Sequence, residues 1–161
     1  DSFYSQGRTF EASEVLSLTI RTKRLLPEVF LSVTIPHTLP LDKQAELALD
    51  LIDKGADLIQ TEGGTSATPL SPGALGLIEK ASPTLAAVFT ISAAIRKSGS
   101  DIPVICASGL SSVTVPMALS LGASGVGVGS VVNRLETEIE MVAVIRSLQE
   151  TIISSKSFSR A

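Results

Sequence analysis

The chain has 161 residues, of which 44% are hydrophobic and 18% charged, a composition that can bury the core of one globular domain. A formal net charge of −3 and an aromatic content of 4% argue against nucleic acid as a partner. With one cysteine and one histidine, neither an internal disulfide nor a Cys/His zinc site can form, and no metal is expected. Apolar runs such as 85–95 are too short to span a membrane, so no membrane is expected either. Because the sequence opens with Asp1 rather than Met, we expect a processed or truncated start.

Helices and strands are predicted to alternate along the whole chain. Short apolar runs ending in small or polar residues predict strands, and apolar residues at helical spacing predict helices. In chain order these are a helix at 11–26, a strand at 30–35, a helix at 41–54, a strand at 57–61, a helix at 83–98, a strand at 103–107, a helix at 112–121, a strand at 125–129 and a helix at 135–154. The nearly continuous apolar character of the strands predicts burial on both faces. Gly55, Gly99 and Gly122 each follow a helix, which is typical of the short returns in parallel α/β folds.

The fold class is indicated by the distribution of polar residues. Every predicted strand runs into a loop of small polar residues, whereas an open sheet gathers its binding residues at one switch point. This pattern favours a (β/α)8 TIM barrel of the phosphate-binding type. Because four βα units are half of eight, residues 1–153 are expected to form the C-terminal half of such a barrel, and 154–161 a frayed tail. A missing N-terminal half or a second copy would complete it.

Two consecutive loops rich in glycine and serine are the strongest functional pattern. They supply the candidate phosphate-binding residues Ser108, Gly109, Ser111, Ser112, Gly127, Gly129 and Ser130. In TIM barrels the corresponding loops, followed by a short helix expected here at 130–133, form the usual phosphate site. A small phosphorylated molecule is therefore the expected ligand; the cofactor stays unknown, with FMN or a phosphorylated metabolite as the candidates. The alternative is that the glycines relieve packing and Ser112 only caps a helix.

The candidate catalytic residues at the strand ends are Thr34, His37 and Glu62. Glu62 could take a proton alpha to a carbonyl, or it could pair with an arginine or a backbone N–H. His37 titrates near neutrality, although a loop histidine bonded to a carbonyl is the commoner case. No lysine falls on a predicted strand, so a Schiff-base mechanism is not supported.

The connection from 62 to 83 is longer than is usual in α/β units and begins with Gly63, Gly64 and Thr65. Long ordered loops on the catalytic face are often lids, so these residues are predicted to belong to one. Cys106 lies inside a predicted strand and is expected to be a small buried side chain rather than a nucleophile.

Several segments match one known family: 1–4, Leu31-Ser32-Val33-Thr34 with Pro36-His37, the run 59–66, Pro72-Gly73, Cys106-Ala107-Ser108-Gly109-Leu110-Ser111 and the run 122–130. On these residues the chain resembles the hypothetical chloroplast open reading frame 23 family of algal plastids, cyanobacteria and plants. The resemblance implies a barrel, a location in the chloroplast stroma or the cyanobacterial cytoplasm, and a further N-terminal half in family members.

Two functions remain open from the sequence. One is an enzyme acting on a phosphorylated small molecule, which the polar strand ends favour. The other is a non-catalytic plastid binding or regulatory protein that retains the barrel. The last two units are also similar to those of thiazole synthase and flavin-binding barrels, whose glycine loops hold phosphate, although this likeness is one of fold alone.

Overall fold

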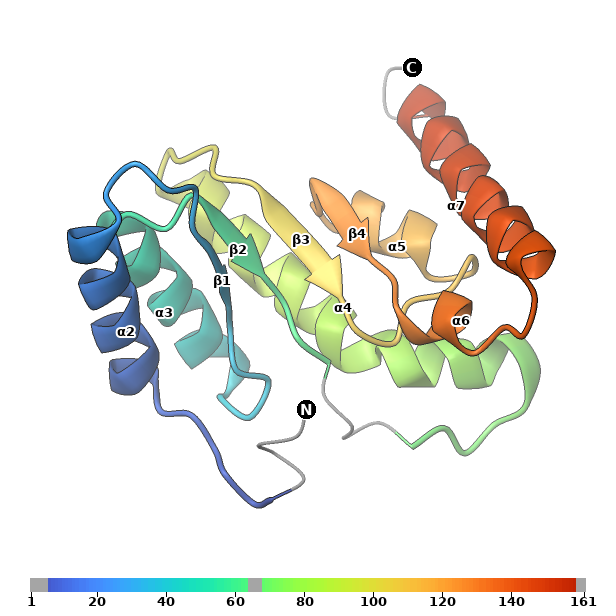
Figure 1. Ribbon diagram of the computed structural model, residues 1–161, viewed down its shortest axis with the longest axis horizontal. Helices are drawn as coiled ribbons and strands as arrows, with labels where there is room; N and C mark the ends of the chain where they lie inside the picture. Colours follow the sequence, from blue (N-terminus) through green and yellow to red (C-terminus); the bar gives the residue numbers. More distant parts are fainter. Residues whose placement is uncertain (1–5, 64–67, 159–161) are drawn as a thin grey trace.

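The four predicted strands form one parallel sheet, in the order in which they occur along the chain (Figure 1). The structure is a computed structural model that describes residues 6–63 and 68–158. Its strands are β1 (Ser32–Thr34), β2 (Leu58–Gln60), β3 (Val104–Ala107) and β4 (Gly125–Gly127). Val33 pairs with Ile59 and Cys106 pairs with Val126. The predicted strand order is confirmed, and each strand is shorter than predicted.

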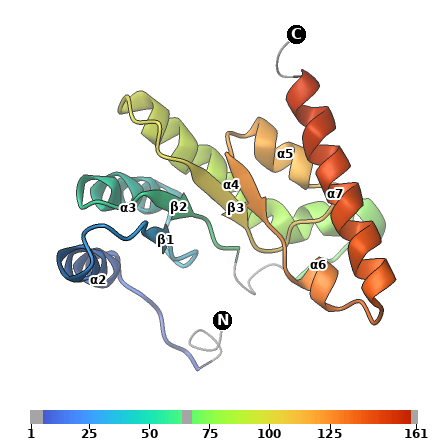
Figure 2. The ribbon, with the colours of Figure 1, turned by 45° about the horizontal axis from the view of Figure 1, so that its top comes forward.

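Helices return the chain between the strands and follow the same order. They are α2 (Ala12–Leu25), α3 (Leu41–Asp53), α4 (Gly73–Lys97), α5 (Val115–Ser120), α6 (Ser130–Asn133) and α7 (Glu138–Phe158). Helix α2 packs on α3, α3 on α4, α4 on α5 and α5 on α7. Figures 1 and 2 show α3 and α4 side by side along the sheet. The result is an α/β fold consistent with part of a barrel, and α6 confirms the predicted short helix.

The hydrophobic core lies between the sheet and the helices. Ile59 of β2 and Leu51 of α3 are fully buried there, together with Val33 of β1. On either side of Val33, however, Ser32 and Thr34 are exposed. Alternate residues of a strand point to opposite faces, so β1 is buried on one face only. The prediction that strands are buried on both faces is therefore wrong for β1.

Helix α4 begins at Gly73 and contains Pro83, which the sequence pattern placed at its start. Proline is common in the first helical turn, which explains the error. The additional turns are tied to the loop before them, because the Glu79 carboxylate accepts hydrogen bonds from the backbone N–H groups of Leu70 and Ser71 at 2.8 and 3.0 Å. The connection after β2 is consequently shorter than the lid predicted at 62–83.

The same helix is long and apolar enough, by length and composition alone, to cross a membrane. The expectation that the apolar runs are too short is wrong for α4, which has 25 residues. Its side chains Leu85, Val88 and Ile91 are nevertheless buried in the core, where α4 packs against β3 and α3. This burial is typical of the central helix of a globular domain.

Helix α7 also differs from its predicted bounds. It runs to Phe158, so it includes residues that were predicted to belong to a frayed tail starting at 154. Leu148 of α7 is buried in the hydrophobic core and anchors the helix beside α5.

An ion pair fastens α2 to the amino-terminal edge of the sheet. The Lys23 ammonium lies 2.7 Å from the Asp57 carboxylate and also donates to the carbonyl of Val29. The same carboxylate accepts a hydrogen bond from the N–H of Leu31 at 2.7 Å. The bond from Lys23 and then that from Leu31 lower the pKa of Asp57. Asp57 therefore joins α2 to the sheet at the edge opposite the carboxyl ends of the strands.

We expect Asp57→Asn to lower the thermal unfolding midpoint at neutral pH. Because the pKa of Asp57 is lowered by folding, its stabilising contribution is present at neutral pH and is lost as pH falls through its titration range. The difference between variant and parent should therefore shrink on acidification, as measured by circular dichroism. The exposed Asp101, which precedes β3, provides the control Asp101→Asn. Equal effects of the two substitutions at every pH would contradict this role.

Candidate functional site

A cavity of about 470 Å³ lies at the carboxyl ends of all four strands. Parallel pairing brings these ends to one edge, where α/β proteins place their ligand sites. The lining residues are Thr34, Gln60, Thr61, Glu62, Ala107, Ser108, Gly109, Leu110, Gly127, Val128, Gly129 and Ser130. Glu62 is the ionisable side chain among them. The cavity thus contains both a carboxylate and the two glycine loops.

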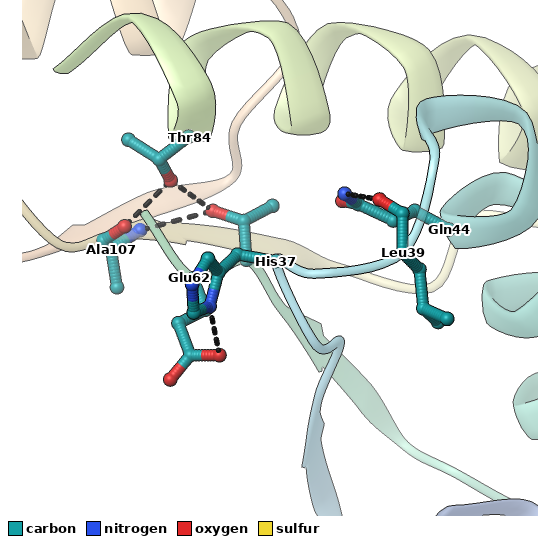
Figure 3. Close-up of polar contacts among 7 residues, drawn as sticks. His37, Leu39, Gln44, Glu62, Thr84 and Ala107 are labelled. Atoms are coloured by element: carbon teal, nitrogen blue, oxygen red, sulfur yellow. Dashed lines mark hydrogen bonds and ion pairs between the residues drawn. The ribbon is translucent and has the colours of Figure 1, made fainter. Parts of the chain in front are cut away.

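His37 and Glu62 form a pair at the ends of β1 and β2. The Nδ1 atom of His37 lies 3.0 Å from a carboxylate oxygen of Glu62, and their side chains are 12% and 17% exposed. Figure 3 shows the imidazole and the carboxylate facing each other. The strand pairing of Thr34 with Gln60 explains the approach, because it sets the two following loops side by side. The candidate catalytic residues Thr34, His37 and Glu62 were all predicted from the sequence. That His37 would be the partner of Glu62 was not predicted.

The two members of the pair have different access to the site. Glu62 lines both the main cavity and a neighbouring one, whereas His37 lines only the neighbouring one, together with Gln44, Pro83 and Ala86. A carboxylate held by an imidazole can exchange a proton with a ligand and pass it on. Thr34 is exposed and lines the main cavity beside Glu62. The arrangement can therefore support proton transfer at the Glu62 carboxylate.

Five of the seven candidate phosphate ligands line the cavity, and Ser111 and Ser112 do not. Ser111 is buried, and its N–H donates to the Thr114 hydroxyl at 2.9 Å. Ser112 is exposed in the turn before α5. The residue immediately preceding that helix is Thr114, which is fully buried and whose hydroxyl makes no capping hydrogen bond, so Ser112 does not cap α5. Polar residues in this segment therefore divide between the site and the start of the helix.

Glycine occurs at the three positions of the second loop for different physical reasons. A Cβ atom on Gly125 would lie 2.9 Å from the Ile105 side chain, and one on Gly127 would lie 3.0 Å from Cβ of Ala107. Packing against β3 thus accounts for both. A Cβ on Gly129 would meet nothing within 4 Å, so packing does not account for that glycine.

Backbone donors remain at the cavity wall. Among the described residues, the N–H groups of Leu110, Val128 and Gly129 donate no hydrogen bond. All three residues line the cavity. Backbone N–H groups without partners are suited to an anion. In residues 6–63 and 68–158 no three His, Cys, Asp or Glu side chains are grouped as a metal site requires.

Of the predicted lid residues, Gly63 is buried against Ser108, and a Cβ there would lie 3.2 Å from the Ser108 hydroxyl oxygen. Gly64 and Thr65 lie outside the described residues. Cys106 is fully buried, and burial raises the pKa of its thiol. The prediction of a small buried side chain at Cys106 is confirmed, because its environment opposes formation of the reactive thiolate.

Sequence reasoning missed Thr84 of α4, which reaches the end of β3. Its hydroxyl donates to the carbonyl of Ala107 at 2.6 Å and lies 2.6 Å from the hydroxyl of Thr61 (Figure 3). The N–H of Ala107 in turn donates to the Thr61 hydroxyl at 3.2 Å. A threonine inside an apolar helical pattern gives no signal of such a contact. Only the packing of α4 on β3 brings these groups together.

The fold is that of an α/β protein whose parallel four-stranded sheet is consistent with part of a barrel. The solved structure of the YdjI aldolase from Escherichia coli K12 is similar, with a TM-score of 0.53 at 14% identity, over 88% of this chain and 54% of that one. At this identity the likeness concerns the fold alone.

The chain belongs to the DUF561 family of proteins of unknown function, whose model matches residues 1–158. It is 39% identical over 160 residues to the uncharacterized protein ycf23 of Porphyra purpurea, which covers 99% of this chain and 58% of the relative. It is 43% identical over 153 residues to ycf23 of Cyanophora paradoxa, covering 94% and 60%. The resemblance noted in the sequence is confirmed, and a plastid or cyanobacterial origin is indicated. The chain spans somewhat more than half the length of these relatives.

Substitution by alanine should destabilise the protein at Gly122 but have little effect on stability at Gly129. Gly122 has a φ of +107°, and its Cβ would lie 2.9 Å from Cβ of Ser92. We expect Gly122→Ala to lower the free energy of unfolding by about 1–3 kcal/mol, and Gly129→Ala to change it by less than ~0.5 kcal/mol. Urea unfolding of the two variants measures the difference. A loss of stability at Gly129 equal to that at Gly122 would show that both glycines serve packing.

Proposed function

We propose that the protein binds a small phosphorylated molecule at the carboxyl edge of its sheet, as the C-terminal half of a phosphate-binding (β/α)8 barrel. One observation carries the proposal: a single cavity contains both glycine loops and the Glu62 carboxylate. A ligand with a phosphate at one end and a reactive carbon at the other fits such a site. The cavity volume of about 470 Å³ matches a small metabolite or part of FMN.

The anion would be held without a basic side chain. No Lys or Arg is among the described residues that line the cavity, and the proposed donors are the N–H groups of Leu110, Val128 and Gly129 with the hydroxyls of Ser108 and Ser130. Glycine at 129 leaves room for a phosphate to approach the backbone. Ser111 and Ser112 stand outside this set and contribute through the loop that they form.

Glu62 is the proposed general base. It would remove a proton alpha to a carbonyl of the bound molecule, with His37 holding the carboxylate in position and Thr34 contacting the ligand beside it. A second candidate function is a non-catalytic binding protein, which is favoured by the scarcity of ionisable groups: Glu62 alone among the described lining residues has an ionisable side chain. The two functions share the same anion site. In a plastid the protein would act in the stroma, and in a cyanobacterium in the cytoplasm.

Inorganic phosphate should raise the thermal unfolding midpoint of the protein, and the shift should grow with phosphate concentration. In Gly129→Val the side chain would occupy the approach of the anion, so the shift should be lost while the fold is retained. Differential scanning fluorimetry at constant ionic strength, with sodium chloride in place of phosphate, measures both. An undiminished shift in a folded Gly129→Val protein would place the anion elsewhere. Glu62→Gln should keep the phosphate shift, and turnover of phosphorylated carbonyl compounds by the parent but not by this variant would select the enzyme.

The barrel would be completed by strands that the longer relatives carry outside the matched region. A groove of about 410 Å³ lies between α2 and β1 and is lined by apolar side chains that include Phe10, Val15 and Leu18. Within the described residues, β1 is the first strand of the sheet and pairs only with β2. A strand that precedes α2 in a (β/α)8 barrel would lie parallel to β1 in this groove. The relatives' additional length supplies the candidate occupant.

Without such strands, the 161-residue chain should self-associate through this groove, because free strand edges and apolar faces favour pairing. Leu18→Asp introduces a charge in the groove and should shift sedimentation velocity profiles toward the monomer. The control Leu75→Asp changes a similarly exposed leucine of α4 and should leave the distribution unchanged. A compact monomer that unfolds cooperatively in the parent chain would contradict the proposal.

A further inference from the structure

The end of β3 is held by a closed ring of hydrogen bonds. The Ala107 N–H donates to the Thr61 hydroxyl, and the Thr84 hydroxyl donates to the Ala107 carbonyl. Since the Thr84 proton is used in that bond, the 2.6 Å contact between the two hydroxyls must be donated by Thr61. Both threonines are at most 1% exposed, and Ala107 is 8% exposed. Within the ring each hydroxyl therefore gives one hydrogen bond and receives one, away from solvent, and the Thr84 hydroxyl also lies 3.5 Å from the Cys106 sulfur.

The ring lies just beyond the last backbone hydrogen bond between β2 and β3. The last ladder bond between β2 and β3 runs from the Thr61 N–H to the Ile105 carbonyl, at 2.9 Å. Beyond it, the two side-chain hydroxyls hold both backbone groups of Ala107. Thr84 belongs to α4, so the ring joins the central helix to the ends of two strands. The peptide that leads into the site is fixed by three elements at once.

The next residue, Ser108, has a φ of +77° and is the one non-glycine residue with positive φ in the described part of the chain. Side chains rarely occupy this left-handed region, and glycine would occupy it without strain. Ser108 lines the cavity, and its side chain lies against Gly63, which has no Cβ to displace it. A strained conformation persists only where its surroundings impose it, and the ring on Ala107 supplies that constraint.

We propose that Thr61 and Thr84 are positioning residues that hold Ser108 in its left-handed conformation, so that the Ser108 hydroxyl is in place for a phosphoryl oxygen before the ligand arrives. The inference rests on the proposed phosphate site. It adds Ser108 as a residue that contacts the ligand and the hydrogen-bonded ring as the feature that orients Ser108. Serine at this position is explained by a hydroxyl that contacts the anion, since glycine would relieve the backbone. Orienting the donor beforehand reduces the conformational entropy lost on binding.

The test measures the affinity for inorganic phosphate by titration calorimetry and the unfolding midpoint without phosphate. Thr84→Val removes one hydroxyl of the ring and should weaken phosphate binding about tenfold, whereas Thr84→Ser keeps the hydroxyl and should bind as the parent does. Ser108→Gly should also weaken binding about tenfold while leaving the midpoint unchanged or raised. Thr90→Val is the matched control, because Thr90 lies on the same helix and, within the described part of the chain, its hydroxyl bonds only to the carbonyl of Ala86.

The outcomes separate the two proposals. Phosphate binding that is undiminished in Thr84→Val or in Ser108→Gly, with binding by the parent intact, would overturn the positioning role alone. If Thr84→Val does not fold, Ser108→Gly decides the question, since it leaves the ring in place. A parent chain that binds no phosphate would overturn the proposed function and the positioning role together. A weakening in Thr84→Val that Thr84→Ser does not rescue would assign Thr84 a packing role and overturn its part in the proposal.

Discussion

Parallel pairing of the four strands is the constraint on which the other features depend. A parallel strand cannot follow its neighbour through a tight turn, so a helix must carry the chain back each time. As a result all carboxyl ends meet at one edge and all amino ends at the other. The pairing of Thr34 with Gln60 and of Ala107 with Gly127 brings four separate loops around one cavity. No single segment of the chain could form that site.

The two edges of the sheet are held by different kinds of interaction. At the amino edge, a charged pair of Lys23 and Asp57 joins α2 to the sheet, and the partly exposed groups keep access to solvent. At the carboxyl edge, the groups that fix the backbone are buried neutral hydroxyls of Thr61 and Thr84. A neutral ring avoids the cost of burying charge and leaves Glu62 as the charged side chain facing the cavity. The ion pair and the proposed ligand site are thereby separated along the strands.

Glycine and serine have several roles in this small region. Gly125 and Gly127 lack side chains because β4 packs closely on β3, while Gly129 lies in open space at the cavity. Ser111 helps to start α5, but Ser108 lies in the site. The same residue types thus have structural roles and proposed binding roles a few positions apart. Composition of the loop alone cannot assign them, since the neighbours that decide come from β3 and α4.

Local patterns determined much of the fold. The order of elements, the parallel sheet and the short helix α6 followed from apolar periodicity and loop composition, because these depend on residues close together in the chain. The strand-end positions of Thr34, His37 and Glu62 followed for the same reason. The start of α4 did not follow from local patterns, because proline is typical of a first helical turn and Pro83 therefore indicates a start at that residue. The hydrogen bonds of Glu79 that hold the earlier turns leave no periodic pattern in the sequence.

What only the tertiary structure decided are the contacts between distant segments. His37 and Glu62 are 25 residues apart, and Thr61 and Ala107 are 46 apart, so their meeting depends on strand register rather than on sequence spacing. Thr84 looks like any threonine of an apolar helix until α4 is laid on β3. The sequence by itself determined which residues lie at the functional edge, since each strand and its loop are local. Which of them touch was decided by the packing of one βα unit against the next, because the hydrogen bonds that join them require the assembled sheet.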